Sequence, residues 1–271
     1  PSLAQRFPLF INSEYKAQEL EGLVGYILNP LNQELYQKST IVHSNFSDSK
    51  ASLNTAFKYF KYYFPENKIP VIYTYISGLN YMEPIICNDT AIVIGLDMFL
   101  GQNYKEYQRE KIPLFVSKKY DKKHLPTEAV KAYALTKFAN HLNGETLLDY
   151  MINLGKIEYF TKNLFPNIED SSLFVFSTAE MNWCTEKEKV FWDHLISTKS
   201  LFSKDFQVFK KYIEPQPFIS SLERESPGQA GVWLGYRIVS SYMNNHPKTT
   251  LKDLMETNNP NDVFQGSKYK P

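Results

Sequence analysis

Apolar residues recur with helical spacing over much of the chain. In the first 50 residues the pattern is irregular, apart from apolar positions over residues 20–27 that end at Asn29-Pro30. A clearer amphipathic helix is predicted near residues 51–64, and Pro65 ends it. The apolar face of this helix consists of Leu53, Phe57, Phe60 and Phe64. Phenylalanines at this spacing are typical of a helix face that packs in the core.

The pattern changes to that of strands after Pro70. Residues 71–76, 85–87 and 90–94 are rich in β-branched and aromatic side chains, which favours strands. Asn88-Asp89, between the last two segments, tolerates the left-handed turn of a tight hairpin. We therefore predict a three-stranded antiparallel meander over roughly residues 71–96.

The pattern is helical again from about residue 103 onward. Pro126 is expected to open one helix, and Gly144 to separate it from the next. Further helix starts are predicted at the capping box Thr185–Glu188, at Ser226-Pro227 for a helix reaching about Met243, and at the capping pair Thr250–Asp253.

These elements predict an α+β fold, a predominantly helical single domain with a small meander sheet. The domain is expected to span residues 1–271, because no linker, repeat or low-complexity tract divides the chain. Within it we distinguish an irregular or helical part over 1–50, a helix and the sheet over 51–102, and a helical part over 103–271.

Composition narrows the function only by exclusion. The 30 lysines and arginines nearly balance 29 acidic residues, so no global field attracts nucleic acid, and no nucleic-acid partner is predicted. The 11 glycines leave little room for glycine-rich phosphate loops. The two cysteines, Cys87 and Cys184, form either one disulfide or two buried thiols.

The sequence lacks the common signatures of catalysis. The closest two of the five histidines are 17 residues apart, so no H-E-x-x-H zinc motif exists. No G-x-S-x-G nucleophile elbow and no phosphate-binding loop is present either. We predict no catalytic residues, no metal site and no cofactor.

Three segments stand out as candidate ligand or partner sites. Gly231 and Gly235 share one helix face, which indicates either close packing against another backbone or a bare surface for a partner. Arg237 on the same helix is a surface charge or the partner of a buried acid. Asp97, which interrupts an apolar run, can hold a cation, act as a base or cap the following turn. The third segment is the basic C-terminal tail with Lys268 and Tyr269, which by composition alone is a frayed end.

These segments together resemble the GldB family of gliding-motility lipoproteins. The resemblance rests on residues 94–101, 147–156, 183–184, 226–243 and 267–271, which occur in order over nearly the whole chain. It implies an envelope lipoprotein of Gram-negative Bacteroidota, periplasm-facing and anchored through a lipidated N-terminal cysteine. The chain begins at Pro1 without that cysteine, so the anchor is expected to have been removed. The implied partners are envelope proteins of the motility and secretion machinery, and the implied membrane contact is the lipid anchor alone.

The layout is also similar to zincin-like metalloproteases, with a meander, a first helix in the H-E-x-x-H position and a second helix for a third ligand. Tyr133 lies on the first of these helices where metal ligands are expected, and Leu154-Gly155 replaces a Glu-Gly pair on the second. We therefore expect a pseudo-enzyme that acts by protein binding. The alternative is a degenerate hydrolase that uses Glu145 or Glu158 with His141. A polar, water-filled cleft between the two helices favours the alternative, and a filled apolar one opposes it.

Overall fold

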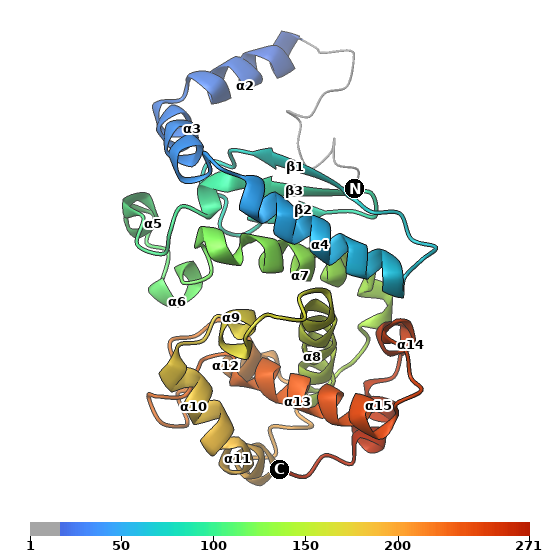
Figure 1. Cartoon of the computed structure of the whole chain (residues 1–271). Helices are drawn as coiled ribbons and strands as arrows, with labels where there is room; N and C mark the ends of the chain where they lie inside the picture. Colours follow the sequence, from blue (N-terminus) through green and yellow to red (C-terminus); the bar gives the residue numbers. More distant parts are fainter. Residues whose placement is uncertain (1–16) are drawn as a thin grey trace.

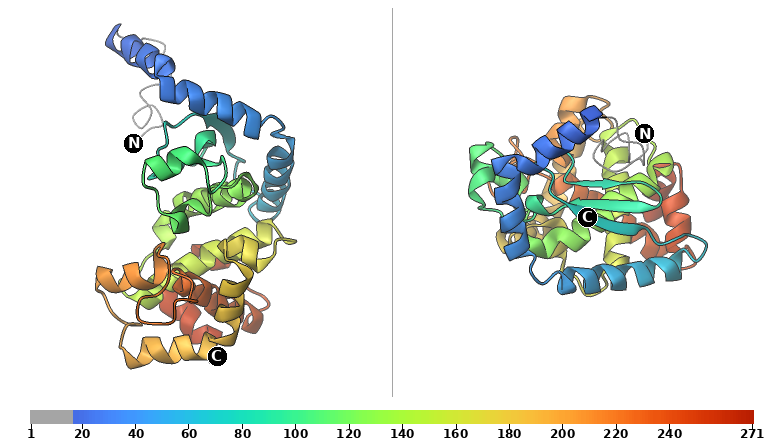
Figure 2. Two further views of the ribbon diagram at one scale, coloured as in Figure 1. Left: turned by 90° about the vertical axis from the view of Figure 1, so that its left-hand side faces the viewer. Right: turned by 90° about the horizontal axis from the view of Figure 1, so that it is seen from above.

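The computed structural model describes residues 17–271, in which helices predominate. The sheet and the helices before α8 form the upper part of the molecule in Figure 1, and the later helices form the lower part. Helix α2 projects from one end of the elongated molecule, and the C-terminus lies at the other (Figure 2). The upper helices are α2 (Ala17–Leu28), α3 (Pro30–Val42), α4 (Ser47–Tyr63), α5 (Lys105–Arg109), α6 (Leu114–Ser117) and α7 (Leu125–Lys137). The later helices are α8 (Leu147–Leu164), α9 (Asp170–Phe174), α10 (Thr178–Glu186), α11 (Glu188–Ser197), α12 (Phe206–Ile213), α13 (Ala230–Asn245), α14 (Leu251–Glu256) and α15 (Pro260–Ser267).

The sheet has the strand order β1-β3-β2, with β1 (Val71–Tyr75), β2 (Ile85–Cys87) and β3 (Ala91–Gly95). The predicted α+β class is confirmed, and so is the hairpin of β2 and β3 around Asn88-Asp89. The predicted meander is wrong, because β1 pairs in parallel with β3 and not with β2. The zincin-like layout built on that meander is not confirmed.

The connection between β1 and β2 explains the mixed sheet. It runs around the end of β3, where the carboxylate of Asp97 accepts hydrogen bonds from the backbone N–H groups of Ser77 (2.6 Å) and Leu79 (2.7 Å). Gly78 and Leu79 have positive φ angles, which turn the chain toward the far edge of β3. Strand β3 therefore becomes the central strand, and all five of its residues are buried.

Several predicted helix starts are confirmed. Pro126 lies in the first turn of α7, and Thr250 and Asp253 form a capping box at α14. Asn29 caps α3, so the break predicted at Asn29-Pro30 separates α2 from α3.

Two predicted helix starts need correction. The Thr185–Glu188 box does not form, because Thr185 lies inside α10 and donates a hydrogen bond to the Met181 carbonyl. Only Lys187 separates α10 from α11, which leaves no extended residue to act as a cap. Helix α13 begins at Ala230 rather than at Ser226-Pro227, because Ser226 Oγ instead accepts from the Ile219 N–H in the preceding turn.

Helices α8 and α13 cross at closely spaced backbones. A Cβ atom built on Gly235 would lie 1.8 Å from the Met151 carbonyl oxygen, and one on Gly155 would lie 2.3 Å from the Gly235 carbonyl carbon. A Cβ on Gly231 would meet the Tyr212 carbonyl oxygen of α12 at 2.7 Å. Of the two possibilities left open for the Gly231/Gly235 face, close packing is confirmed, and two different helices occupy the face.

Helix α8 lies at the centre of the hydrophobic core. Its buried residues occur on all sides of the helix, which is typical of a helix enclosed by other elements. One large cluster of buried apolar side chains extends from Leu35 in α3 to Val263 in α15, and Ile86 and Val93 form a second, small cluster. A charged side chain on the enclosed faces of α8 is therefore buried unless it lies at a cleft that opens to solvent.

Candidate functional site

A cleft of about 310 Å³ opens between the two central helices α7 and α8. Its floor and walls are largely apolar, with Ile85 of β2 on one side and Leu154 and Ile157 of α8 on another. Aromatic rings come from both parts of the molecule. The charged lining residues are Glu83, Lys118, Lys119, Glu128, Lys131 and Glu158, and the aromatic ones are Phe99, Phe115, Tyr120, Phe174 and Phe176.

Three charged side chains form a buried cluster in this cleft. The ammonium group of Lys131 in α7 lies 3.0 Å from Glu158 Oε2 in α8 and 3.6 Å from Glu128 Oε1 in α7. It also donates a hydrogen bond of 2.5 Å to the backbone carbonyl of Leu173. The side chains of Lys131, Glu158 and Glu128 are 13%, 10% and 17% exposed, so water screens their charges weakly. We call this group the Glu-Lys-Glu cluster.

Burial and charge act in opposite directions within the Glu-Lys-Glu cluster. Burial raises the pKa of Glu158 to about 7, and the attraction of Lys131 only partly offsets this rise. Burial alone would lower the pKa of Lys131, but the carboxylates of Glu158 and Glu128 outweigh it and raise that pKa. Lys131 therefore stays charged, and Glu158 changes protonation near neutral pH.

The carboxylate of Glu158 is incompletely satisfied. Its Oε2 atom pairs with the Lys131 ammonium group at 3.0 Å, but this contact is poorly aligned for a hydrogen bond and no other described residue donates to the oxygen. Glu158 as a whole is 7% exposed, so bulk water has little access to this oxygen. A buried acceptor in this state favours a ligand or an ordered water that donates to it.

The rim of the cleft carries a second ion pair. Lys118 lies 3.1 Å from Glu180 Oε1 at the start of α10, and its ammonium group lies 5.3 Å from the centre of the Phe176 ring. An ammonium group over an aromatic face is attracted to the ring electrons. The upper and lower parts of the molecule thus meet at the rim through a salt bridge and a cation–π contact.

The predicted site residue Asp97 lies outside the cleft. It is fully buried, and both carboxylate oxygens accept hydrogen bonds from Ser77 and Leu79 in the connection after β1. Burial raises the pKa of Asp97, although these hydrogen bonds oppose the rise. Its hydrogen bonds anchor the preceding connection, and they do not cap the following turn.

Tyr133 also faces away from the cleft. Its ring packs edge-to-face on Phe57 and Phe60 of α4, with centroid distances of 5.7 and 5.6 Å. Burial raises its pKa to about 12. Tyr133 therefore belongs to the core between α7 and α4.

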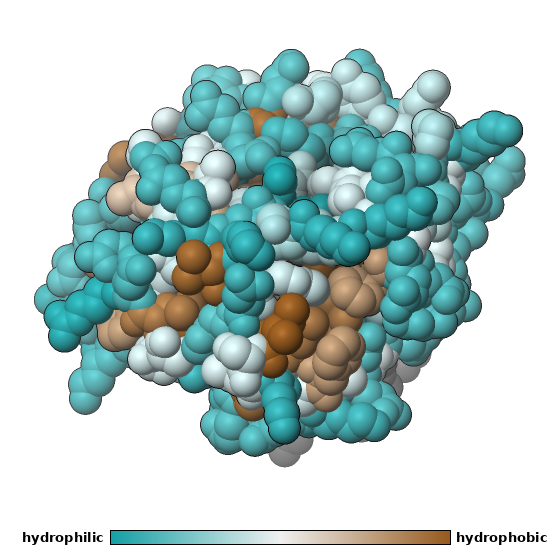
Figure 3. Space-filling model, turned by 90° about the horizontal axis from the view of Figure 1, so that it is seen from below, coloured by the Kyte–Doolittle hydropathy of each residue, from teal (hydrophilic) through white to brown (hydrophobic). Residues whose placement is uncertain are grey.

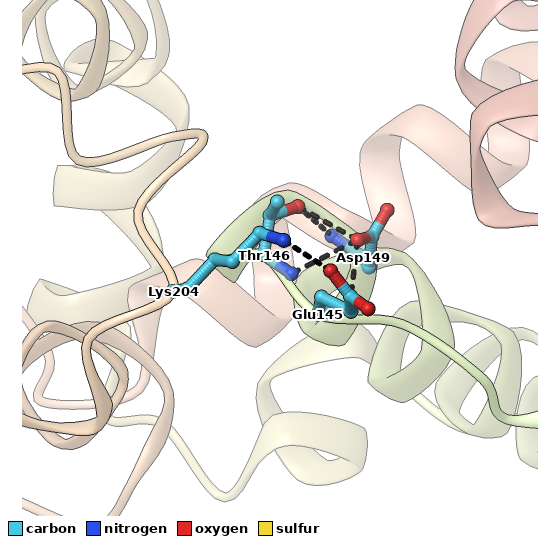
Figure 4. A network of polar contacts seen from close by, with 4 residues as sticks. All are labelled: Glu145, Thr146, Asp149 and Lys204. Atoms are coloured by element: carbon cyan, nitrogen blue, oxygen red, sulfur yellow. Dashed lines mark hydrogen bonds and ion pairs between the residues drawn. The ribbon is translucent and has the colours of Figure 1, made fainter.

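The residues proposed for a degenerate hydrolase are not assembled. His141 Nδ1 lies 2.7 Å from Asn258 Oδ1, and no contact joins His141 to Glu158 or Glu145 among the described residues. Glu145 pairs with Lys204, and its backbone N–H donates to Asp149 in the capping network of α8 (Figure 4). The arrangement predicted for the alternative function is therefore absent from residues 17–271.

Lys156 is a buried charge outside the set of predicted site residues. It is 1% exposed, and its ammonium group donates to the backbone carbonyls of Thr257 (2.8 Å) and His141 (3.3 Å). No carboxylate pairs with it among the described residues. Burial lowers its pKa to about 8. Lys156 and Glu158 are two positions apart in α8, so they point to different sides of the helix.

Lys156 predicts a specific pH dependence of stability. Between its folded pKa near 8 and its ordinary value of 10.5, the unfolded chain binds more protons at this lysine than the folded chain. Stability from this group therefore rises with pH, by up to ~3 kcal/mol relative to Lys156→Met. Urea unfolding of both proteins at pH 7.5 and pH 10 measures this difference. A difference that stays constant with pH contradicts the assignment.

Two predicted partner residues, Arg237 and Tyr269, meet at one acid. Glu188 Oε1 accepts hydrogen bonds from Arg237 Nε (2.9 Å) and from the Tyr269 hydroxyl (2.5 Å). The Tyr269 ring packs edge-to-face on Trp192, at a centroid distance of 5.4 Å. The C-terminal tail is therefore held on α11 and α13 rather than frayed. Its neighbour Lys268 is exposed, with a left-handed backbone that ends α15.

Tyr269→Phe is expected to lower the free energy of unfolding by about 1–2 kcal/mol, because it removes a hydrogen bond to a charged acceptor. Tyr62→Phe, at a position that is 78% exposed, is the matched control and is expected to be neutral. Thermal or urea unfolding of both variants tests this. Equal stability of the two variants would show that the tail contact is not stabilising.

The two cysteines are not joined. Both Cys87 and Cys184 are buried thiols, in β2 and α10 respectively. Burial raises the pKa of the Cys184 thiol, which opposes a role as nucleophile. Of the two possibilities left open by the sequence, the structure shows buried thiols.

The underside of the molecule carries scattered apolar groups. Figure 3 shows these groups separated by hydrophilic side chains on that face. In the segment from α11 to α12, the large apolar side chains that are more than half exposed are Val190, Ile196, Phe202 and Phe206. Lone exposed apolar residues are common on soluble surfaces, so they define no single site by themselves.

The sequence could have revealed more of the cleft than it did. Apolar residues occur all around α8, which is typical of an enclosed helix. The charged residues Lys156 and Glu158 on such a helix are therefore expected to be buried or to lie at an opening. Glu128 and Lys131 lie one turn apart on the preceding helix, a spacing at which opposite charges are neighbours. Of the predicted site residues, only Glu158 lines the cleft.

The structure defines an α+β protein dominated by helices, with a partly charged cleft between its two central helices. None of the described helices has the length and apolar character needed to cross a membrane. The whole chain, residues 1–271, matches the family model of the gliding motility protein GldB, and the chain belongs to this family. The family consists of gliding-motility-associated lipoproteins, which indicates association with the cell envelope. No curated protein and no solved structure matches the chain significantly.

Proposed function

We propose that this protein acts by binding a protein partner of the motility and secretion machinery, without catalysis. The cleft between α7 and α8 is the proposed binding site. We place the protein in the envelope, facing the periplasm and held to a membrane by an N-terminal lipid. The family membership supports the association with gliding, and the geometry of the cleft supports the mode of action.

The Glu-Lys-Glu cluster is the observation that carries this proposal. The Lys131 ammonium group already lies within 3.0 Å of Glu158 and 3.6 Å of Glu128. A divalent cation that used these two carboxylates would have to displace Lys131, which is also bonded to the Leu173 carbonyl. A built-in cation with apolar and aromatic walls suits the binding of a partner segment better than metal-assisted hydrolysis.

The test is to fill the cleft and ask whether specific partners are lost. Ala132 of α7 lines the cleft, so Ala132→Phe reduces its volume. Ala139→Phe makes the same change at an exposed position outside the cleft and is the matched control. Both variants are expressed as full-length lipidated protein, cross-linked in cells and purified, after circular dichroism confirms that each is folded.

We expect wild type and Ala139→Phe to recover the same machinery components, and Ala132→Phe to lose them. Recovery of bulk outer-membrane proteins alone from wild type would refute the proposal. The raised pKa of Glu158 keeps a hydrolase as the second candidate, because catalytic acids often have such values. Peptidase activity that Glu158→Gln abolishes would establish this second candidate.

A further inference from the structure

We infer that the cleft between α7 and α8 recognises an amino group carried on an apolar or aromatic segment, such as a lysine side chain or the amino terminus of a partner. This inference rests on the proposed function, because it names the chemistry of the partner segment that the cleft accepts. Two independent observations carry it, namely the buried Glu158 carboxylate, whose Oε2 has a single poorly aligned donor, and the aromatic walls.

The first observation is the state of the Glu158 carboxylate. It lines the cleft, it is 7% exposed, and the one described donor near its Oε2 is the Lys131 ammonium group, 3.0 Å away and poorly aligned for a hydrogen bond. With both acids ionised, the Glu-Lys-Glu cluster has one more negative than positive charge. A donor that is itself cationic satisfies the oxygen and cancels that charge, and charge-assisted hydrogen bonds are the stronger kind.

The second observation is that the walls already hold one ammonium group. Lys118 Nζ lies 5.3 Å from the centre of the Phe176 ring, which stacks on Phe174 with centroids 5.6 Å apart. Phe99 and Phe115 line the same cleft. Aromatic faces attract cations and also bury the carbon chain that carries them. An apolar segment ending in an amine therefore matches both the walls and the acid.

An anionic ligand has fewer available cationic partners in this cleft. Two of its lysines already have carboxylate partners. Lys131 contacts two carboxylates and a backbone carbonyl, and Lys118 forms a salt bridge with Glu180. Lys119 lies over the Tyr120 ring at 5.7 Å and is the third lysine of the lining. An anion would also face Glu83, Glu128 and Glu158. These three carboxylates favour an amine over an anion.

Three probes that share one carbon skeleton, a phenyl ring on a four-carbon chain, test the inference on the whole protein. They are 4-phenylbutylamine, 4-phenylbutanol and 4-phenylbutanoate, which differ only in the terminal group. Titration followed by protein NMR gives the affinity of each probe and shows whether resonances of Ile157 and Leu154 shift. We expect the amine to bind about tenfold or more tightly than the other two, with its shifts confined to the cleft.

Glu158→Gln supplies the control on the acid. It is expected to weaken the amine about tenfold while the affinity for the alcohol stays within about twofold, because the walls remain. Unchanged binding of the alcohol also shows that the cleft is still folded. Equal or tighter binding of the butanoate, or an amine preference that survives Glu158→Gln, overturns the inference.

Probes that shift no cleft resonance also overturn the inference, but not the proposed function. The partner recovery that Ala132→Phe tests is judged separately, because a partner can fill the cleft without an amine. Conversely, amine binding in a protein whose partners ignore Ala132→Phe would support this ligand preference and refute the proposed role of the cleft in partner binding.

Discussion

Gly235→Ala is expected to destabilise the protein by about 3 kcal/mol, the upper end of the usual cost of overpacking, and Gly235→Leu to destabilise it further. A Cβ at this position would lie 1.8 Å from the Met151 carbonyl oxygen and 2.4 Å from its carbonyl carbon. Both are backbone atoms of α8, so no side chain can rotate away to make space. The crossing of α8 and α13 would have to open, and the core around it would lose contacts. Urea unfolding followed by circular dichroism measures the effect.

Helix propensity alone gives the opposite expectation, a gain of about 1 kcal/mol for glycine to alanine inside a helix. Gly22→Ala in α2 is the matched control, because no atom lies within 4 Å of the Cβ that it introduces. We expect this control to be neutral or stabilising. If Gly235→Ala raised the unfolding midpoint as Gly22→Ala does, the close crossing would be wrong and the glycine face would be open to a partner.

Lys131→Met is expected to cost about 3–5 kcal/mol at pH 8, because it leaves two buried carboxylates without their cation. Lys189→Met is the control, since its pair with Asp193 is exposed by 69% and 58%, and pairs of this kind contribute little. The triple variant Lys131→Met, Glu128→Gln, Glu158→Gln is expected to regain most of the stability, because none of the three charges of the Glu-Lys-Glu cluster remains. A loss equal to that of Lys189→Met would mean that the Glu-Lys-Glu cluster is solvated.

The deficit of Lys131→Met is also expected to shrink as the pH falls. The folded pKa of Glu158, about 7, already lies above its ordinary value of 4.5 in the wild type. Between these values the folded protein binds more protons at Glu158, so stability from this group falls as pH rises. Without Lys131 the folded pKa rises further, which steepens that fall. Unfolding free energies of wild type and variant at pH 5 and pH 8 check the sign.

Local chemistry determined much of the secondary structure from the sequence alone. Four local signals predicted elements that form. They are the helix break at Asn29-Pro30, the apolar face of α4, the turn at Asn88-Asp89 and the capping pair Thr250–Asp253. Each of these signals lies within a few residues of the element that it predicts. The Thr185–Glu188 box failed for a related reason, because its motif lies inside a continuous helix where the threonine bonds to the helix backbone instead.

Long-range contacts decided the sheet. Whether β1 pairs with β2 or with β3 depends on the path of residues 76–84, and that path is anchored by Asp97, which lies 18 and 20 residues beyond Leu79 and Ser77. No local pattern reports this anchor. The one sequence signal was the unbroken apolar run of β3, which is typical of a central strand and not of the end of a meander.

The sequence by itself determined the helical α+β class and the shared helix face of Gly231 and Gly235, because periodicity and glycine spacing are local properties of the chain. The resemblance of several ordered segments indicated the family. Only the tertiary structure decided which helices those glycines contact, that Arg237 and Tyr269 share Glu188, and that Glu158 meets Lys131 rather than His141. Burial and charge pairing arise when segments far apart in sequence are brought together, and the shift of a side chain's pKa from its ordinary value arises with them.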